Sequence, residues 1–196
     1  MTSWTIPAVV VVFGYLLGSV PFGLVIARAR GVDIRQRGSG NIGATNVARN
    51  LGKKLGVLVL LLDALKGALP VIGATLLGLE PLVICAVGWA AIVGHCFPVW
   101  LGFRGGKGVA TSLGVLIVID PAVTALSAVA FAMVVGATRM VSLGSLVAMS
   151  SFPIAAWALG RPSALVLLGV ATAAVVLIQH RDNLRRIVRG TEHRFR

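Results

Sequence analysis

The chain has 196 residues, of which 57% are hydrophobic and only 12% are charged. A soluble globular domain carries about 25% charged residues, so this composition excludes an ordinary soluble protein and indicates one surrounded mostly by lipid. The formal net charge of +12 comes from 18 Lys and Arg against 6 Asp and Glu. In a chain this apolar, the basic excess indicates loops that face the cytoplasm and anionic headgroups rather than a nucleic-acid partner.

Seven apolar runs follow one another along the chain, separated by polar or proline-marked segments. A transmembrane helix needs about 20 mostly apolar residues, and six of the runs are close to that length or longer. The run at 108–119 falls short of a hydrocarbon core of about 30 Å, because a helix rises about 1.5 Å per residue. We therefore predict an all-α membrane protein that forms a single domain over residues 1–196. The seven predicted transmembrane helices lie at about 5–27, 55–78, 81–100, 108–119, 121–138, 140–159 and 162–179.

The distribution of Lys and Arg predicts the orientation of these helices. With the N-terminus outside, every Lys and Arg falls in a cytoplasmic segment except Lys66 and Arg161. The cytoplasmic segments are then 28–54, 101–107, the turn at Arg139, and 180–196. Basic loops remain on the cytoplasmic side, so the pattern predicts a periplasmic N-terminus and a cytoplasmic C-terminus in a multi-pass cell (inner) membrane protein.

The first cytoplasmic segment contains a glycine-rich stretch, 38–46, whose sequence is GSGNIGATN. Glycines let the backbone adopt positive φ and bring its N–H groups close to a ligand, while hydroxyl, amide and guanidinium groups add donors. This is the composition of a phosphate or carboxylate site, although a plain connector between helices is the alternative. The candidate binding residues are Ser39, Gly40, Asn41, Thr45, Asn46 and Arg49.

A second glycine-rich stretch, Arg104-Gly105-Gly106-Lys107-Gly108, comes directly before the run at 108–119. A helix N-terminus with basic side chains beside it is a ready anion site. The stretch is not a nucleotide-binding P-loop, since glycine rather than Ser or Thr follows Lys107. A turn that simply carries positive charge is the alternative. We take Arg104, Gly105 and Gly106 as candidate phosphate-binding residues and Lys107 as a candidate catalytic residue.

The third cluster, His180-Arg181-Asp182-Asn183, opens the C-terminal segment. His180 and Asn183 are three residues apart and share one face of a helix at the membrane boundary. An amphipathic basic tail that rests on anionic lipid is the alternative. All three clusters fall on the cytoplasmic side of the predicted topology. Together they predict one basic, glycine-lined site that binds phosphate next to lipid.

One of the apolar runs contains two ionisable residues. Asp63 and Lys66 lie on one face of the run at 55–78, where ionisable groups face the interior of a helix bundle. A structural ion pair is favoured over a part of the substrate pocket.

Only two Cys and three His are present, and they are widely spread. No metal site is therefore expected.

In order and composition, these clusters resemble the PlsY family of membrane glycerol-3-phosphate acyltransferases. The resemblance covers essentially the whole chain. It is carried by GSGNIGATN at 38–46, GHCFP at 94–98 with FRGGKG at 103–108, and HRDN at 180–183 with Gly190-Thr191-Glu192. It implies a seven-helix enzyme of the inner membrane whose site faces the cytoplasm.

The resemblance also implies a reaction. An acyl group moves from acyl-phosphate to the 1-hydroxyl of glycerol 3-phosphate, giving lysophosphatidic acid and inorganic phosphate. Lys107, His180 and Asn183 are the implied catalytic residues, and either His180 or a phosphate oxygen of the substrate is the general base. Acyl-phosphate is already activated, so positioning and electrostatics suffice and no cofactor is expected. The oligomeric state is open, and a monomer is compatible with the sequence.

Two other functions compete with this prediction. A transporter for an organic phosphate fits the helices, the pair Asp63 and Lys66, and the basic vestibule, but no polar path continues to the outer side. A non-catalytic lipid-binding scaffold would use the same basic interface, yet it needs no clustered glycines. The concentration of polar chemistry on one side therefore favours the enzyme.

Overall fold

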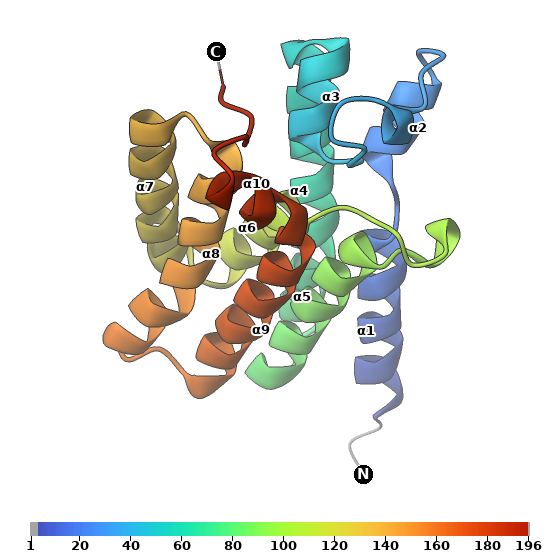
Figure 1. Cartoon of the computed structure of the whole chain (residues 1–196). Coiled ribbons are helices and arrows are strands. Elements are labelled where there is room, and N and C mark those ends of the chain that lie inside the picture. The colour runs from blue at the N-terminus through green and yellow to red at the C-terminus, as the bar shows by residue number, and fades with distance from the viewer. Residues whose placement is uncertain (1–3, 196) are drawn as a thin grey trace. The chain divides into compact units, whose positions relative to one another are not determined.

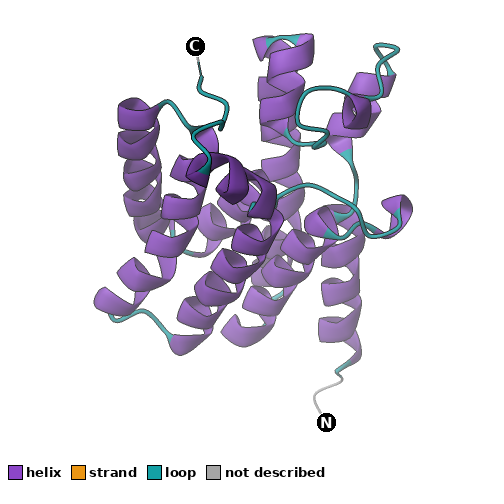
Figure 2. Ribbon diagram, viewed as in Figure 1, coloured by secondary structure: helices purple, strands orange, loops and turns teal. Residues whose placement is uncertain are grey.

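The computed structural model describes residues 4–195, and the regular secondary structure in this part is entirely helical (Figures 1 and 2). The α-helices are α1 (Thr5–Gly18), α2 (Phe22–Arg28), α3 (Ala44–Leu51), α4 (Lys53–Leu76), α5 (Pro81–Cys96), α6 (Val109–Ile119), α7 (Pro121–Thr138), α8 (Val141–Ala158), α9 (Ser163–Gln179) and α10 (Arg181–Val188). Two 3₁₀ turns, η1 (Ile34–Gln36) and η2 (Val99–Leu101), complete the set. The chain divides into two compact units, one ending at Val118 and one beginning at Ile119. The single domain expected from the sequence stays a prediction.

Within residues 4–195, five segments are long and apolar enough to cross a membrane. They are Thr5–Arg28, Lys53–Leu76, Pro81–Leu101, Pro121–Thr138 and Val141–Ala158. The pair α9 and α10, bent by 64°, is a sixth candidate if it counts as one span. Helix α6 has 11 residues and is shorter, as the sequence predicts. The all-α membrane fold is thus confirmed, while the seven crossings and their orientation stay predictions.

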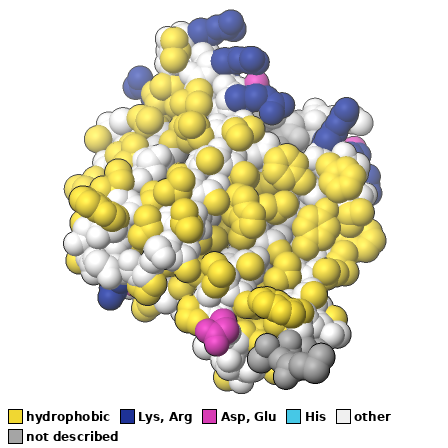
Figure 3. Space-filling model, turned by 90° about the horizontal axis from the view of Figure 1, so that it is seen from below, with side chains coloured by type: hydrophobic (Ala, Val, Ile, Leu, Met, Phe, Trp, Pro, Cys, Tyr) yellow, Lys and Arg dark blue, Asp and Glu magenta, His cyan; other side chains and the backbone are white. Residues whose placement is uncertain are grey.

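Exposed apolar side chains agree with a lipid environment. Leu61 is 55% exposed, Met133 65% and Leu167 64%. Apolar side chains also dominate the face seen in Figure 3, where Lys and Arg side chains lie mainly along the rim. In water such a surface would drive association, whereas lipid tails cover it without cost.

The first predicted helix, 5–27, is in fact two helices. Helix α1 ends at Gly18 and α2 begins at Phe22, with the break at Ser19, Val20 and Pro21. Proline has no N–H group and cannot continue the hydrogen-bond ladder. Leu24 N donates instead to the Pro21 carbonyl at 3.0 Å. The break leaves the Val20 carbonyl outside the helical ladder, and a side chain from α4 bonds to it.

In the first unit, α1 packs on α5, and α4 packs on α1, α3 and α5. At Gly18 the two helix backbones approach so closely that a Cβ would overlap the backbone of Ala91 on α5. Small residues allow this approach in membranes, where dispersion contacts rather than water exclusion hold helices together. Above these helices, α2, η1 and α3 share a buried core with α4, formed by Leu24, Ala27, Ile34, Ile42, Val47 and Val59.

We expect Gly18→Leu to destabilise the protein by about 1–3 kcal/mol, because the side chain has to displace backbone atoms of α5. Thermal unfolding in detergent micelles measures the effect. Gly73→Ala on α4 is the matched control, since a Cβ there meets nothing within 4 Å. It should leave stability unchanged or raise it by up to about 1 kcal/mol through helix propensity. Equal effects of the two variants would contradict the close approach.

The second unit is built from α7, α8, α9 and α10, with α8 packed against both α7 and α9. Ser142 near the start of α8, and the segment that follows α10, lie at the same end of this unit, because Phe195 N donates to the Arg139 carbonyl at 2.6 Å. This contact places the residues after Gly190 beside the start of α8. The C-terminal segment is therefore part of the folded unit.

Candidate active site

The glycine-rich loop at 38–46 is held in shape by a single buried side chain, Asn46, which is 2% exposed. Its Nδ2 donates to the carbonyls of Ile34, Arg37 and Asn41, at 3.2, 3.0 and 2.8 Å. Its Oδ1 accepts from Ser39 N and from Asn50 Nδ2, both at 3.0 Å. All of these hydrogen bonds connect the Asn46 amide to the loop and the segments that flank it.

Glycine is required where the loop wraps around this amide. Gly38 and Gly40 have φ of +55° and +70°, and a Cβ at Gly38 would overlap Asn46 Oδ1. The loop then leads into α3, whose N-cap is Gly43, and Asn41 Oδ1 accepts from Gly43 N at 2.9 Å.

The other candidate residues of this stretch line the outside of the loop. Ser39 and Arg49 are exposed, whereas Gly40, Asn41 and Thr45 are half-buried. Thr45 lies in the first turn of α3 and Arg49 in its last turn. Hydroxyl and amide groups thus lie on the loop and the start of α3, with the Arg49 guanidinium one helix length away, and their role in binding stays a prediction.

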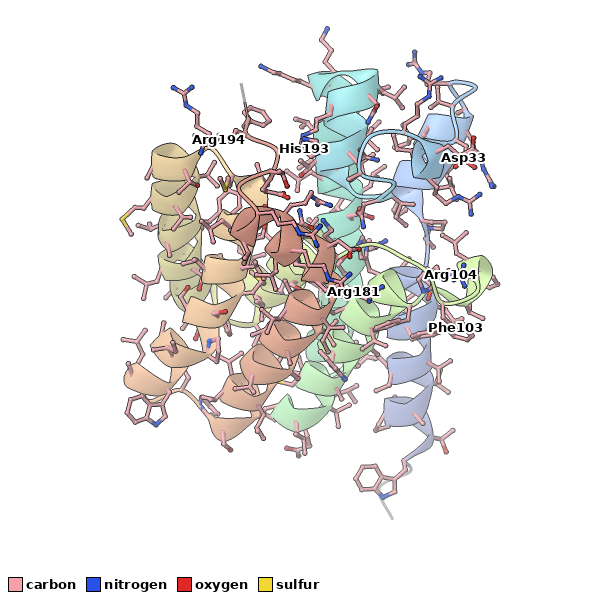
Figure 4. The ribbon with its side chains drawn as sticks, viewed as in Figure 1. Asp33, Phe103, Arg104, Arg181, His193 and Arg194 are labelled. Carbon is pink, nitrogen blue, oxygen red and sulfur yellow. The ribbon has the colours of Figure 1, made fainter. Side chains whose placement is uncertain are left out.

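The second glycine loop folds back on the end of α5. Gly105 N donates to the Cys96 carbonyl at 3.1 Å, and Gly106 N donates to the His95 carbonyl at 3.0 Å. A Cβ at either glycine would overlap these residues, so the close approach needs glycine at both positions. Phe103 and Arg104 lie on the exposed outer turn (Figure 4).

Lys107 follows Gly106 and is half-buried, and α6 begins two residues later at Val109. The first N–H groups of an α-helix lack partners within the helix and carry partial positive charge. A lysine at this point adds a full positive charge to that end. Two further hydroxyls in the first turn, on Thr111 and Ser112, are fully buried.

Both glycine loops rest on the same part of the first unit. Leu101 of η2, shortly before the second loop, packs against the core that contains Ile34, Ile42 and Val47 under the first loop. The two glycine loops therefore lie beside one core of the first unit, and their common place in one site stays a prediction.

The third cluster belongs to the second unit, where His180 caps α10 and is 2% exposed. Its Nδ1 lies 2.8 Å from the Val176 carbonyl. A carbonyl only accepts, so Nδ1 carries a proton, and the ring in its neutral form is the Nδ1–H tautomer. This tautomer follows from the hydrogen-bond geometry. The juxtaposition of His180 with the two glycine loops stays a prediction.

Asn183, on the first turn of α10, is 5% exposed and is held by Glu192. Its Nδ2 donates to Glu192 Oε1 at 2.6 Å. Ser142 Oγ donates to the same oxygen at 2.8 Å, and Arg186 Nε donates to Oε2 at 2.7 Å. The carboxylate thus joins α8, α10 and the C-terminal segment. Burial raises the pKa of Glu192, but the hydrogen bonds from Ser142, Asn183 and Arg186 outweigh burial and hold the pKa below its ordinary value of 4.5.

The sequence prediction did not include Ser142 or assign a role to Glu192. Glu192 was visible only as part of a motif, Gly190-Thr191-Glu192. Ser142 is 50 residues away from it in the sequence, and no spacing rule connects the two. The one available signal for Glu192 was its position just after an arginine-rich helix, because a carboxylate there forms an ion pair with an arginine of the helix.

We expect the C-terminal segment to loosen as the pH falls. The pKa of Glu192 is lower in the folded than in the unfolded chain, so its stabilisation is present above about pH 4.5 and is lost as the pH falls through the folded-state pKa. Hydrogen exchange of the segment after α10, measured from pH 6 down to about pH 3 and corrected for the intrinsic rate, gives the effect. Glu192→Gln should exchange faster at every pH and remove most of the pH dependence.

Comparison with known proteins places these features in a family. The model of a family described as Glycerol-3-phosphate acyltransferase matches residues 8–190. A glycerol-3-phosphate acyltransferase of Anaeromyxobacter sp. is 50% identical over the whole of both chains. One from Geobacter sulfurreducens is 49% identical over 93% of this chain and 94% of the relative. The chain belongs to the glycerol-3-phosphate acyltransferase family.

Solved structures of this family agree. The crystal structure of PlsY, an integral membrane glycerol 3-phosphate acyltransferase in its glycerol 3-phosphate form, superposes with a TM-score of 0.93 at 43% identity. The match covers 97% of this chain and 96% of that one. The lysophosphatidic acid form gives a TM-score of 0.90, covering 97% of this chain and 95% of that one. The resemblance to the PlsY family inferred from the motifs is thus confirmed, and with it the assignment to an acyltransferase family.

Proposed function

We propose that the chain transfers an acyl group from acyl-phosphate to the 1-hydroxyl of glycerol 3-phosphate, giving lysophosphatidic acid and inorganic phosphate, the first acylation of phospholipid synthesis. The names of the relatives and the two ligand forms of the similar crystal structure support the acceptor and the product. The observation that carries the proposal on this chain is Lys107, set between a tightly folded glycine loop and the N-terminus of α6.

The reaction needs little more than placement and charge. The hydroxyl oxygen attacks the acyl carbonyl carbon, a C–O bond forms, and the bond from that carbon to the phosphate oxygen breaks with its electron pair on phosphate. Lys107 and the first N–H groups of α6 stabilise the charge that develops on the departing phosphate. The hydroxyl proton goes either to Nε2 of His180 or to a phosphate oxygen of the substrate.

The remaining candidates bind and orient the two substrates. Ser39, Gly40, Asn41, Thr45 and Arg49 offer donors for phosphate on the first loop, and Arg104, Gly105 and Gly106 do so on the second. Asn46 serves by shaping the first loop rather than by contact. In the second unit, Glu192 orients the Asn183 amide, which in turn orients a substrate. Mixed anhydrides lose phosphate readily, so the proposal includes no metal and no cofactor.

The proposed site faces the cytoplasm from the inner membrane, and the protein acts among membrane lipids. Nearly all Lys and Arg residues lie in segments that the charge pattern assigns to that side. The acyl chain then lies in lipid while both phosphates meet basic loops. This arrangement brings a lipid-soluble donor and a water-soluble acceptor to one interface.

Purified protein in a lipid mesophase, given palmitoyl phosphate and glycerol 3-phosphate alone, tests the proposal. Equal amounts of inorganic phosphate and lysophosphatidic acid are expected. Turnover with an acyl thioester but not with acyl-phosphate would preserve the reaction and change the donor. No turnover with any donor, in protein shown to be folded, would overturn the proposal, and uptake of labelled glycerol 3-phosphate into sealed vesicles would then support the transporter.

A further inference from the structure

Three ionisable side chains lie buried together in the first unit, outside both glycine loops. Asp63 and Lys66 on α4 are each 2% exposed, and His95 near the end of α5 is 4% exposed. Lys66 Nζ lies 2.8 Å from Asp63 Oδ1, and His95 Nδ1 lies 3.7 Å from the same oxygen. The ion pair expected from the sequence is therefore present, and His95 joins it as a third member.

On one side, this cluster reaches the break between α1 and α2. Lys66 Nζ donates to the Val20 carbonyl at 2.7 Å and lies 5.7 Å from the centre of the Phe22 ring. The lysine thus compensates the carbonyl that the break removes from the helical ladder. It also fixes the start of α2, whose Leu24 and Ala27 form part of the core under the first glycine loop.

On the other side, the cluster reaches the second glycine loop. The His95 carbonyl accepts from Gly106 N at 3.0 Å, and a Cβ at Gly106 would overlap His95 Nε2. The imidazole therefore lies between Asp63, at its Nδ1 edge, and the backbone of Gly106, at its Nε2 edge. Lys107 is the next residue, and it enters α6 from a backbone that this ring supports.

Stability alone is a poor reason for such a cluster. Ionisable groups inside a membrane are costly, and apolar side chains of similar size often replace a buried ion pair without loss of stability. What apolar side chains do not reproduce is the hydrogen bond from Lys66 Nζ to the Val20 carbonyl and the carboxylate of Asp63 beside the His95 ring, whose Nδ1 is buried 3.7 Å from Oδ1 without a hydrogen-bond partner among the described residues. The cluster therefore contributes geometry.

We propose that Asp63, Lys66 and His95 act as one positioning unit that sets the backbone of Gly105, Gly106 and Lys107, and so places the Lys107 ammonium for acyl transfer. The inference rests on the proposed function of Lys107. In this proposal the three residues are positioning residues rather than substrate-binding ones. They act through the loop.

The first test replaces the charges in two ways. Asp63→Asn keeps the shape of the side chain, and the double variant Asp63→Leu/Lys66→Met removes both charges, so no unpaired charge remains in the membrane. Both are expected to lower kcat by about 10- to 100-fold, the scale on which small misplacements act. The double variant should keep its thermal midpoint at or above that of the unchanged protein. A lower kcat at unchanged stability then reports the position of the loop rather than a loss of fold.

Thr75→Val is the matched control, because its hydroxyl bonds the Val71 carbonyl of the same helix at 2.9 Å, well beyond Asp63 and Lys66 along α4. It should leave kcat unchanged. A double variant that is stable and fully active would overturn the inference, since a purely structural ion pair predicts that result.

A second readout does not depend on turnover. Hydrogen exchange of a peptide that covers 105–108 should rise by about tenfold or more in both variants, while peptides from α7 and α8 stay unchanged. If the unchanged protein turns over no substrate, the proposed function fails and the exchange result still decides whether the cluster holds the loop. Unchanged exchange at 105–108, or faster exchange with unchanged kcat in an active enzyme, would overturn the inference.

Discussion

Replacing Lys107 by alanine is expected to lower kcat by about 10²- to 10³-fold, the usual cost of removing one group that stabilises developing charge. Lys107 is half-buried between Gly106 and the start of α6, so its charge acts in surroundings less polar than water. The fold should be unaffected, because the loop is held by the backbone bonds of Gly105 and Gly106. Lysophosphatidic acid formation under saturating substrates, together with thermal unfolding, measures both quantities.

Lys54→Ala is the control for this experiment. Lys54 lies exposed in the first turn of α4. Its replacement by alanine removes one positive charge from the first unit, as Lys107→Ala does. An exposed charge only attracts anionic substrates from a distance, so its effect should be within about threefold at low salt and vanish at high salt. Near-normal turnover in Lys107→Ala would remove this lysine from the mechanism. Equal losses in both variants would mean that Lys107 only attracts anionic substrates from a distance.

Helix ends were predictable where proline meets a polar residue. Helix α5 begins at Pro81 and α7 at Pro121, and Pro162 caps α9, as the sequence indicates. A proline inside an apolar run does not by itself decide whether the helix breaks there. Pro70 and Pro153 lie within continuous α4 and α8, whereas Pro21 accompanies a break. The difference is tertiary, since at the Pro21 break the Val20 carbonyl accepts from Lys66 Nζ of α4 at 2.7 Å as well as from Phe22 N at 3.1 Å.

The chemistry of the site was readable from composition, but its internal supports were not. Glycine, asparagine and arginine in one stretch favour an anion-binding loop, because the glycines free the backbone N–H groups and the polar side chains add donors. The pair Asp63 and Lys66 was visible because helical spacing puts them on one face. His95 and Glu192 were not assigned roles, since their partners come from other helices and sequence spacing carries no information on such contacts. Asn46 was expected to bind substrate, and its position at the centre of the loop indicates a different task.

Asn46→Asp is expected to destabilise the first glycine loop by about 1–3 kcal/mol, although the two side chains have nearly the same shape. The amide donates to three backbone carbonyls, at 2.8 to 3.2 Å, and a carboxylate donates to none of them. The Asn41 carbonyl then loses its donor, at a cost of about 1–3 kcal/mol, while the Ile34 and Arg37 carbonyls keep the backbone donors Arg37 N and Gly40 N. A negative charge that faces all three carbonyl oxygens adds repulsion. Hydrogen exchange of residues 34–50 and the thermal midpoint are the measurements.

The matched control is the same substitution five positions earlier. Asn41 uses its side chain as an acceptor from Gly43 N at 2.9 Å, and aspartate accepts at least as well. At the N-terminal end of α3 the added negative charge is also favourable for the helix. Asn41→Asp should therefore keep the loop folded and slow its exchange slightly, even if a carboxylate there repels substrate phosphate. A loop equally protected in both variants would mean that the donors of Asn46 do not hold it, and Asn46 would return to the set of residues that contact substrate.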